Sequence, residues 1–308
     1  MSGSNGNENT VPKKGIRERI MDCLTSRDET VTTQKMIDDE DKDTQECMDS
    51  YLRELTRSPL SKTWNQYRHK KWAHDDSLPP LEDLEKEMVA LVPSYSAFCH
   101  IGKTKELDCA FIPLFPFERP HLQDTIQKGM ISRRSLHLRF NRQIDSVSSN
   151  LLDYLTNVDM FDHLAVGCTV FENGHWQTIA TARVIRERDQ PEWAEWAAIV
   201  ADPYHRNTIG TCLLYFISRI ALRAGVKMLY AVVNPANAPV LHWMKKLGAK
   251  VQMRQNVNVW CFPIPLPEDW VENQEVREQI DRASAGENIV PELVEAYVRD
   301  NFAYMNTL

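Results

Sequence analysis

The chain has 308 residues, of which 43% are hydrophobic and 26% charged, a composition typical of globular proteins with enough length for one large domain or two ordinary ones. Its formal net charge of -7 argues against a general nucleic-acid or anionic-membrane binder, because such partners need a basic surface. The longest apolar stretches, such as residues 212–217, are far too short to span a bilayer, and the first residues lack the apolar core of a secretory signal. We therefore expect a cytoplasmic or nuclear protein with no nucleic acid and no membrane as partner.

The seven cysteines are scattered along the chain, and no two of them have Cys-x-x-Cys spacing. An odd number of cysteines without a pattern favours free thiols in a reducing compartment. We therefore expect neither a disulfide framework nor a metal site.

Residues 1–80 differ in composition from the rest of the chain and are predicted to form an N-terminal extension. Residues 1–13 are polar and rich in Gly, Asn and Ser, which predicts disorder. Short helices are expected over residues 15–24 and 44–56. Between residues 62 and 72, basic residues alternate with Trp64, Tyr67 and Trp72. Such a stretch can bind nucleic acid or acidic partners, but we favour an amphipathic segment that packs its aromatic rings on the main domain.

A second region, residues 81–263, alternates between strand-like and helix-like apolar patterns and begins with a predicted helix over residues 81–91. Asn173-Gly174 separates two β-rich runs and predicts a hairpin turn. Because only part of the order follows βαβ alternation, the region predicts an α/β fold with a mixed sheet and helices on its faces. Residues 264–308 read as a charged tail with one last helix over 291–304. The predicted strands of the second region are 109–114, 164–171, 178–185, 193–200, 228–233, 251–254 and 257–262, and its other helices are 118–130, 149–158, 211–224 and 238–247.

The stretch 199–214 runs from a strand through a short turn into a helix. The first N–H groups of a helix have no intrahelical partner, and the helix dipole places partial positive charge there, so a pyrophosphate docks well at such an end. Gly210 lets the backbone approach an anion closely. Thr208 and Thr211 can donate from their hydroxyls, and Arg206 can supply charge.

This stretch resembles the motif of the GNAT acetyltransferases, Q/R-x-x-G-x-G/A, that wraps the pyrophosphate of CoA. Here the pattern reads His205-x-x-Thr208-x-Gly210, so a histidine stands for Gln/Arg and a threonine for the first glycine. Downstream, a buried strand, Asn237 and then Lys246-Leu247-Gly248 resemble the last motif of the family. Asn237 also fits a helix N-cap, and one side chain can serve both purposes.

The resemblance implies a GNAT fold whose central sheet is splayed at an acyl-CoA site, with acetyl-CoA as co-substrate and no metal. It places the thioester beside the backbone of Ile199 and Val200, which would orient and polarise its carbonyl. The CoA-binding residues that it implies are Ile199, Val200, His205, Arg206, Asn207, Thr208, Ile209, Gly210, Thr211 and Asn237.

Three further segments, 131–140, 156–165 and 194–197, resemble bacterial protein-lysine acetyltransferases, so that the likeness covers about 130 residues. In that family the glutamate of the third segment is the proposed general base, and Glu195 is the matching residue. A lysine amine is mostly protonated at neutral pH and must lose a proton before it attacks a thioester. The alternative for Glu195 is an exposed strand carboxylate or a salt-bridge partner; His163 and His137 are weaker candidates for the base.

Many GNAT enzymes carry a tyrosine seven residues after the asparagine, as acid for the leaving thiolate, and here Met244 stands at that position. A thiolate can leave without strong acid help, because thiol pKa values lie near 8.5.

We expect an acetyl-CoA-dependent N-acetyltransferase that acts by direct attack of a primary amine, a protein lysine or a small molecule. A non-catalytic acyl-CoA-binding or sensor protein of the same fold is the alternative, because the phosphate loop departs from the family at two positions. In a third hypothesis, the extension 1–80 binds a partner and the domain of residues 81–263 serves as a scaffold.

Overall fold

The computed structural model describes residues 58–143, 147–160 and 162–305. The predictions for residues 1–13, 15–24 and 44–56 lie outside these ranges, and the domain boundaries at residues 80 and 263 stay a prediction. Within the described ranges, no helix is both long enough and apolar enough to cross a membrane.

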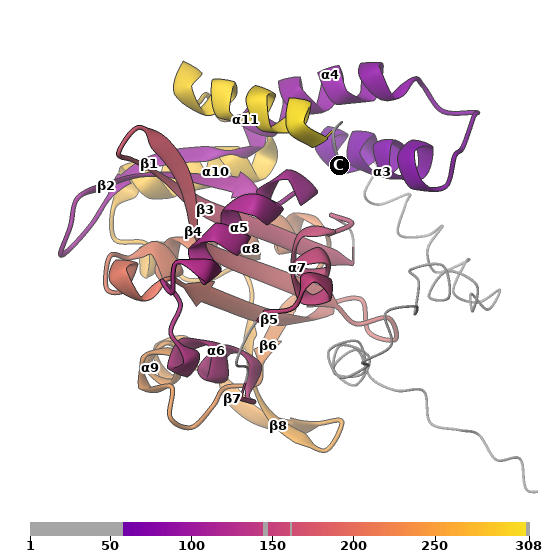
Figure 1. Ribbon diagram of the computed structural model, residues 1–308. Helices are drawn as coiled ribbons and strands as arrows, with labels where there is room; N and C mark the ends of the chain where they lie inside the picture. Colours follow the sequence, from indigo (N-terminus) through magenta and orange to yellow (C-terminus); the bar gives the residue numbers. More distant parts are fainter. Residues whose placement is uncertain (1–57, 144–146, 161, 306–308) are drawn as a thin grey trace, which may run out of the picture. The chain divides into compact units, whose positions relative to one another are not determined.

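One eight-stranded sheet organises the described part of the chain, in the order β1-β2-β3-β4-β5-β6-β8-β7 (Figure 1). All neighbouring strands pair antiparallel except β5 and β6, which are parallel, so the sheet is mixed as predicted. The strands are β1 (Ala97–Ile101), β2 (Leu107–Pro113), β3 (His163–Glu172), β4 (His175–Arg186), β5 (Trp193–Val200), β6 (Met228–Ala231), β7 (Lys250–Arg254) and β8 (Val257–Pro263).

Helices cover both faces of the sheet, because successive residues of its inner strands are buried on opposite faces. On β2, Phe111 belongs to one core together with α8 and α10, whereas Ala110 and Ile112 belong to a second core with α3, α4 and α11. The helices are α3 (Pro59–Trp72), α4 (Leu81–Leu91), α5 (Arg119–Gln127), α6 (Arg133–Phe140), α7 (Ser149–Thr156), α8 (Ile209–Arg223), α9 (Ala238–Lys246), α10 (Gln274–Ala285) and α11 (Glu292–Met305).

Helix α3 confirms the amphipathic interpretation of the basic, aromatic stretch. The side chains of Trp64 and Tyr67 are fully buried in the second core, and Trp64 donates its indole N–H to the carbonyl of Val158 at 3.1 Å. Lys62 and His69 are exposed, whereas Arg68, one turn after Trp64, is half-buried. The rings of Trp64 and Tyr67 therefore serve packing.

The predicted strands and helices of residues 105–263 are confirmed, and three elements were missed. β1 is only five residues long, and α6 buries a single residue, Leu136. The predicted charged tail contains α10, in which Val276, Ile280 and Ala283 recur at helical spacing within an otherwise polar sequence. The hairpin prediction is confirmed, since Asn173 and Gly174 both have positive φ, as a two-residue type I′ turn requires.

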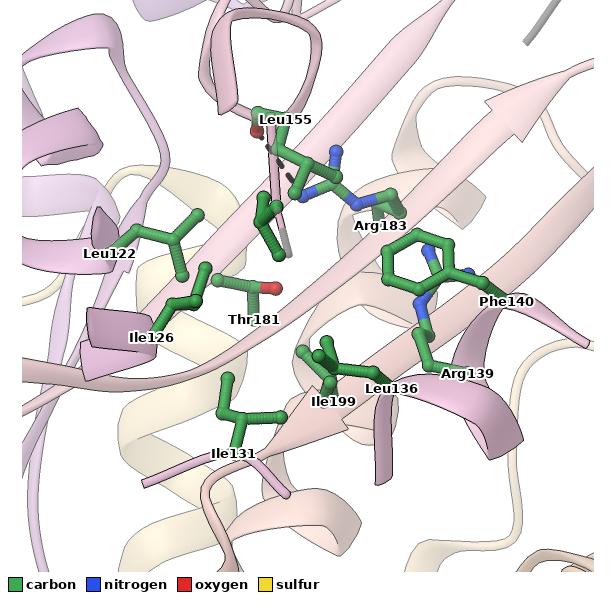
Figure 2. A pocket seen from close by; sticks show the side chains of 11 residues that line it. Leu122, Ile126, Ile131, Leu136, Arg139, Phe140, Leu155, Thr181, Arg183 and Ile199 are labelled. Atoms are coloured by element: carbon green, nitrogen blue, oxygen red, sulfur yellow. Dashed lines mark hydrogen bonds between the residues drawn. The ribbon is translucent and has the colours of Figure 1, made fainter. Parts of the chain in front are cut away.

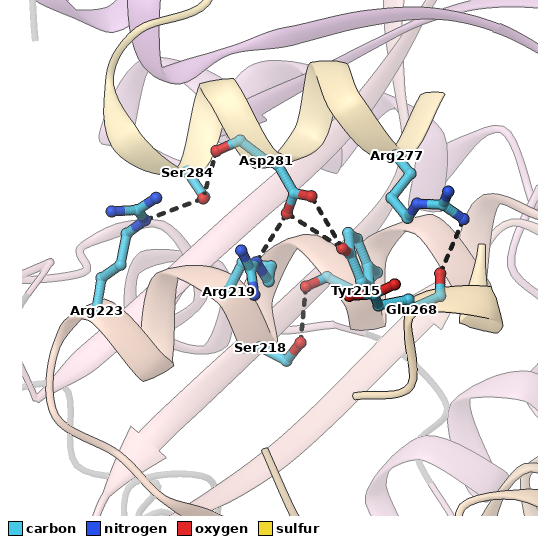
Figure 3. Close-up of polar contacts among 8 residues, drawn as sticks. All are labelled: Tyr215, Ser218, Arg219, Arg223, Glu268, Arg277, Asp281 and Ser284. Atoms are coloured by element: carbon cyan, nitrogen blue, oxygen red, sulfur yellow. Dashed lines mark hydrogen bonds and ion pairs between the residues drawn. The ribbon is translucent and has the colours of Figure 1, made fainter. Parts of the chain in front are cut away.

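Helix α10 holds α8 through a polar contact centred on Asp281 (Figure 3). The carboxylate of Asp281 accepts from the hydroxyl of Tyr215 at 3.1 Å and pairs with Nε of Arg219 at 2.7 Å. One turn further along, Nε of Arg223 donates to the hydroxyl of Ser284 at 3.1 Å. The tail thus fixes the helix that follows the predicted phosphate loop.

Asp281→Asn tests this contact. The ion pair is half-buried, so we expect the substitution to lower the free energy of unfolding by about 1 to 2 kcal/mol in urea titrations. The matched control is Asp300→Asn, because the Arg299–Asp300 pair is exposed and 3.7 Å long, and its loss should change stability by less than about 0.5 kcal/mol. Equal effects of the two variants would show that the Asp281 contact does not hold α8.

Candidate active site

The parallel strands β5 and β6 separate partway along their length. Their pairing covers only residues 193–195 of β5 and 228–230 of β6, and it ends with Glu195 opposite Tyr230. β5 continues for five more residues to Val200, whereas β6 ends at Ala231. The edge of β5 from Trp196 to Val200 is thus open toward β6, with backbone groups that can bind a substrate.

The segment after β5 forms a short turn that leads into α8. Two of its residues, Arg206 and Thr208, have positive φ, +66° and +65°. For a β-branched residue such as Thr208 this conformation costs about 1 to 3 kcal/mol, and such strain is found mainly where function requires it. Alternating backbone conformations of this kind turn successive N–H groups toward one point and form an anion-binding concavity.

The start of α8 keeps its N–H groups free of a side-chain cap. Thr208 is the N-cap residue, but its hydroxyl donates to the carbonyl of Asn207 at 2.5 Å and caps no N–H of the helix. The first helical hydrogen bond runs from the N–H of Cys212 to the carbonyl of Thr208 at 2.9 Å. The loop and the helix dipole together provide a site suited to a phosphate group.

Two side chains of the predicted phosphate loop, those of His205 and Asn207, make hydrogen bonds within the protein. Nε2 of His205 contacts the carbonyl of Val200 at 2.9 Å, which closes the turn. Asn207 is buried, and its Oδ1 accepts from the backbone N–H groups of Thr104 and Lys105 at 3.0 and 3.2 Å. Asn207 therefore ties the loop to the β1–β2 hairpin, and only its backbone is left to contact a ligand. Ile209 is likewise buried in the core, whereas Arg206 is exposed.

Gly210 lies directly beneath Trp243 of α9. A Cβ atom at position 210 would come within 2.6 Å of Cη2 of Trp243. The ring of Trp243 also packs edge-on against Trp270, whose indole N–H donates to the carbonyl of Thr211 at 3.2 Å. The close approach of α9 is therefore a second reason for glycine at this position, beside the access of an anion.

Asn237 caps α9, as the structural alternative predicted. Its Oδ1 accepts from the N–H of Val240 at 3.4 Å. The residue lies in the segment that leaves β6 where the two strands separate. A contact between Asn237 and CoA stays a prediction.

Glu195 lies at the point where the strands part, half-buried on the face of β5 that also carries Ala197 and Ile199. Its charge acts on the groups around it. Burial lowers the pKa of Arg139, and the carboxylate of Glu195 opposes this shift. Burial raises the pKa of Tyr230 far above its usual value, and the negative charge of Glu195 adds to this, so the phenol is neutral. Glu195 also acts on the phenol of Tyr154, so it faces one cation and two neutral hydroxyls.

The two histidines differ in environment. His163 is buried, and its pKa lies well below the usual value because of burial first and then the charges of Arg183, Arg139 and Arg68. The ring is neutral, and its Nε2 lies 3.0 Å from Nη1 of Arg183, which fits an acceptor. His137 is exposed on α6, with Nε2 at 3.5 Å from Nδ2 of Asn234. Neither is placed on β5 beside the open edge.

The sequence interpretation named Glu195 but missed the residues that surround it, Arg139, Tyr154, Arg183 and Tyr230. Arg139 and Tyr230 lie in segments that were singled out for their resemblance to known motifs. Tyr154 and Arg183 carried no motif, and only the pairing of β4 with β5 brings Arg183 opposite Ala197.

A family model matches the part of the chain that holds these residues. Residues 136–249 match the model of the acetyltransferase (GNAT) family, a range that includes the second half of α6, the open edge of β5, the turn and α9. The GNAT domain of S. lividans PAT is a similar solved structure, with a TM-score of 0.48 and 21% identity over 55% of this chain and 97% of that one.

Two acetyltransferases are similar in sequence. The acetyltransferase Pat of Mycolicibacterium smegmatis is 30% identical over 154 residues, which are 48% of this chain and 45% of that protein. An acetyltransferase of Pseudomonas aeruginosa is 27% identical over 107 residues, 35% of this chain and 57% of that protein. The chain thus spans about half the length of these relatives. It carries a domain of the GNAT acetyltransferase family that is homologous to the Pat acetyltransferases.

Proposed function

We propose that the chain transfers an acetyl group from acetyl-CoA to a primary amine, with the side chain of a protein lysine as the leading acceptor. One observation carries the proposal: the open edge of β5 begins directly after Glu195 and ends at a strained turn suited to a phosphate group. A candidate base, an edge for the thioester and an anion site thus follow one another along a single strand. The homology to Pat acetyltransferases supports the same reaction.

The open edge suits the extended arm of CoA. In the described part of the chain, the indole N–H of Trp196, the first residue beyond the pairing, is buried without a hydrogen-bond partner. A buried donor of this kind favours a ligand that brings an acceptor, such as an amide carbonyl. The N–H groups of residues 206–211 would hold the pyrophosphate, and Asn237 would contact the arm.

The roles of the residues follow from the acceptor chemistry. Acetyl-CoA supplies an activated thioester. Glu195 takes a proton from the amine, so that the nitrogen attacks with its free electron pair while the C–S bond breaks. The backbone of Ile199 and Val200 stabilises the negative charge that develops on the carbonyl oxygen. Met244 is buried and offers no acid, so the thiolate leaves without protonation by a side chain at that position.

The acceptor screen tests the function as a whole. Purified protein is mixed with acetyl-CoA and with lysine-containing peptides, polyamines or other small amines, and the released thiol is measured. Release with one acceptor class supports the proposal and names the substrate. Binding of acetyl-CoA without release on any acceptor would favour the non-catalytic acyl-CoA-binding alternative, and no binding would favour the scaffold reading.

Gly210→Asp tests the anion site. We expect it to weaken acetyl-CoA binding more than tenfold in calorimetry, because a carboxylate repels the pyrophosphate and blocks the approach of the backbone. Since a Cβ at this position also meets Trp243, the variants Gly210→Ala and Gly210→Asp are compared in a Trp243→Leu background. There the alanine should bind almost as well as glycine while the aspartate stays weak. If Gly210→Asp also regains its affinity for acetyl-CoA in this background, the whole effect of the substitution comes from packing against α9.

Glu195→Gln tests the base. Glutamine keeps the size of the side chain but cannot accept the amine proton, so turnover should fall by about 100- to 10,000-fold. The affinity for acetyl-CoA should hardly change, since the proposed contacts lie at residues 199–211 and 237. Raising the pH should restore part of the rate, because free amine then forms without help. If Glu195→Gln turns over like the wild-type protein across the pH range, Glu195 has a structural role. The base would then be His163, His137 or a water molecule.

A further inference from the structure

A pocket lies between the sheet and the helices α5, α6 and α7 (Figure 2). Ile199, which lines it, lies on the same face of β5 as Glu195. Ile199 forms part of its floor, next to Thr181 of β4, which is its partner in the sheet. Most of the lining is apolar, but two guanidinium groups also line it, those of Arg139 from α6 and Arg183 from β4. The apolar part includes Leu122, Ile126, Leu136 and Leu155.

Arg183 is placed by the register of the sheet. It lies opposite Ala197, between the partners of Glu195 and Ile199 on the same face. Its side chain is 1% exposed. The guanidinium contacts two neutral acceptors, Nε2 of His163 at 3.0 Å and the carbonyl of Leu155 at 3.2 Å.

The charges around the pocket leave a positive surplus. Burial and then the like charge of Arg139 lower the pKa of Arg183 to about 9, so that it is still charged at neutral pH. Burial raises the pKa of Tyr154, which keeps this phenol neutral, and His163 is neutral as described. Glu195 is the carboxylate that acts on Arg139. Among the described residues, the two cations Arg139 and Arg183 therefore face one carboxylate, that of Glu195.

Arg68, which lies beyond His163, does not change the surplus of positive charge around the pocket. Arg68 acts on His163, and although burial lowers the pKa of Arg68, the carboxylate of Asp159 opposes this shift. This outer pair matches one positive with one negative charge. A buried cation held only by neutral groups is costly unless a further anion completes the site.

We propose that this pocket binds a carboxylate carried by one of the two substrates, on the acyl chain or on the amine acceptor, through Arg183 and Arg139. The inference rests on the proposed function, which places the reacting carbonyl beside Ile199 and the amine beside Glu195, and it replaces either the acetyl group by a dicarboxylic acyl chain or the protein lysine by a free amino acid. Neighbouring residues on one face of a strand are about 7 Å apart, so Arg183 is within reach of a short dicarboxylic acyl chain from the Ile199 side. Arg139 is within reach of the carboxylate of an amino acid from the Glu195 side.

Matched ligand pairs distinguish the two sources. Calorimetry compares succinyl-CoA with butyryl-CoA, and then L-lysine with cadaverine in the presence of CoA; within each pair the carboxylate is the main difference. We expect the carboxylate member of one pair to bind at least tenfold more tightly, because charge-assisted hydrogen bonds to a buried guanidinium are strong. Preference in the first pair identifies the acyl chain, and preference in the second identifies the acceptor.

Arg183→Gln should remove most of that preference, so that the two affinities of the pair differ by less than about threefold. The matched control is Arg186→Gln, since Arg186 is also buried on β4 but donates to the carbonyl of Ala224, away from the pocket. Arg139→Gln gives a second test if the first variant does not fold. If the two ligands of each pair bind the wild-type protein with affinities within twofold of each other, while acetyl-CoA still binds, the carboxylate site is wrong and the proposed function still holds. Failure of every acyl-CoA to bind would overturn both.

Discussion

The early end of the pairing between β5 and β6 is the constraint on which the candidate site depends. Parallel strands normally satisfy one another's backbone groups along their whole length. Here they part after Glu195 and Tyr230, while β5 continues to Val200. The same strand therefore carries a carboxylate at the last paired position, five residues with an open edge, and a turn suited to an anion at its end. No other pair of strands in the described sheet is parallel, so this combination arises at one place in it.

The strained turn needs support from elsewhere, and the β1–β2 hairpin provides it. Arg206 and Thr208 flank Asn207 with positive φ on both sides. The buried side chain of Asn207 accepts hydrogen bonds from the hairpin, including one from the hydroxyl of Thr104 at 2.7 Å. A strained backbone persists only when its surroundings over-determine it. The asparagine thus stabilises the conformation that presents the N–H groups of the loop, while its own side chain bonds to the hairpin.

The sequence predicted the elements that bury long apolar faces. It also predicted two motifs near the point where β5 and β6 separate, the phosphate loop after β5 and the segment with Asn237 after β6. Strands such as Trp193–Val200 and helix α8 were found because their periodicity is strong. β1 and α10 were missed because one is short and the other mostly polar, and both owe their stability to tertiary contacts. For the site, single residues such as Glu195 could be named from motifs. The partners of Glu195 could not, because the register of β4 and the packing of α6 decide which cations reach it.

The cations have a consequence for the base itself. The interaction between Glu195 and Arg139 is attractive, and an amine that gives its proton to Glu195 must approach a carboxylate that already faces a guanidinium. A second anion in the pocket would change this balance, because Arg139 and Arg183 would then share two carboxylates. Glu195 would be left freer to accept a proton from the amine. Under the proposed function, binding of a carboxylate-bearing substrate and activation of the base are therefore coupled through the same two arginines, and neither arginine needs to touch the reacting atoms for this to occur.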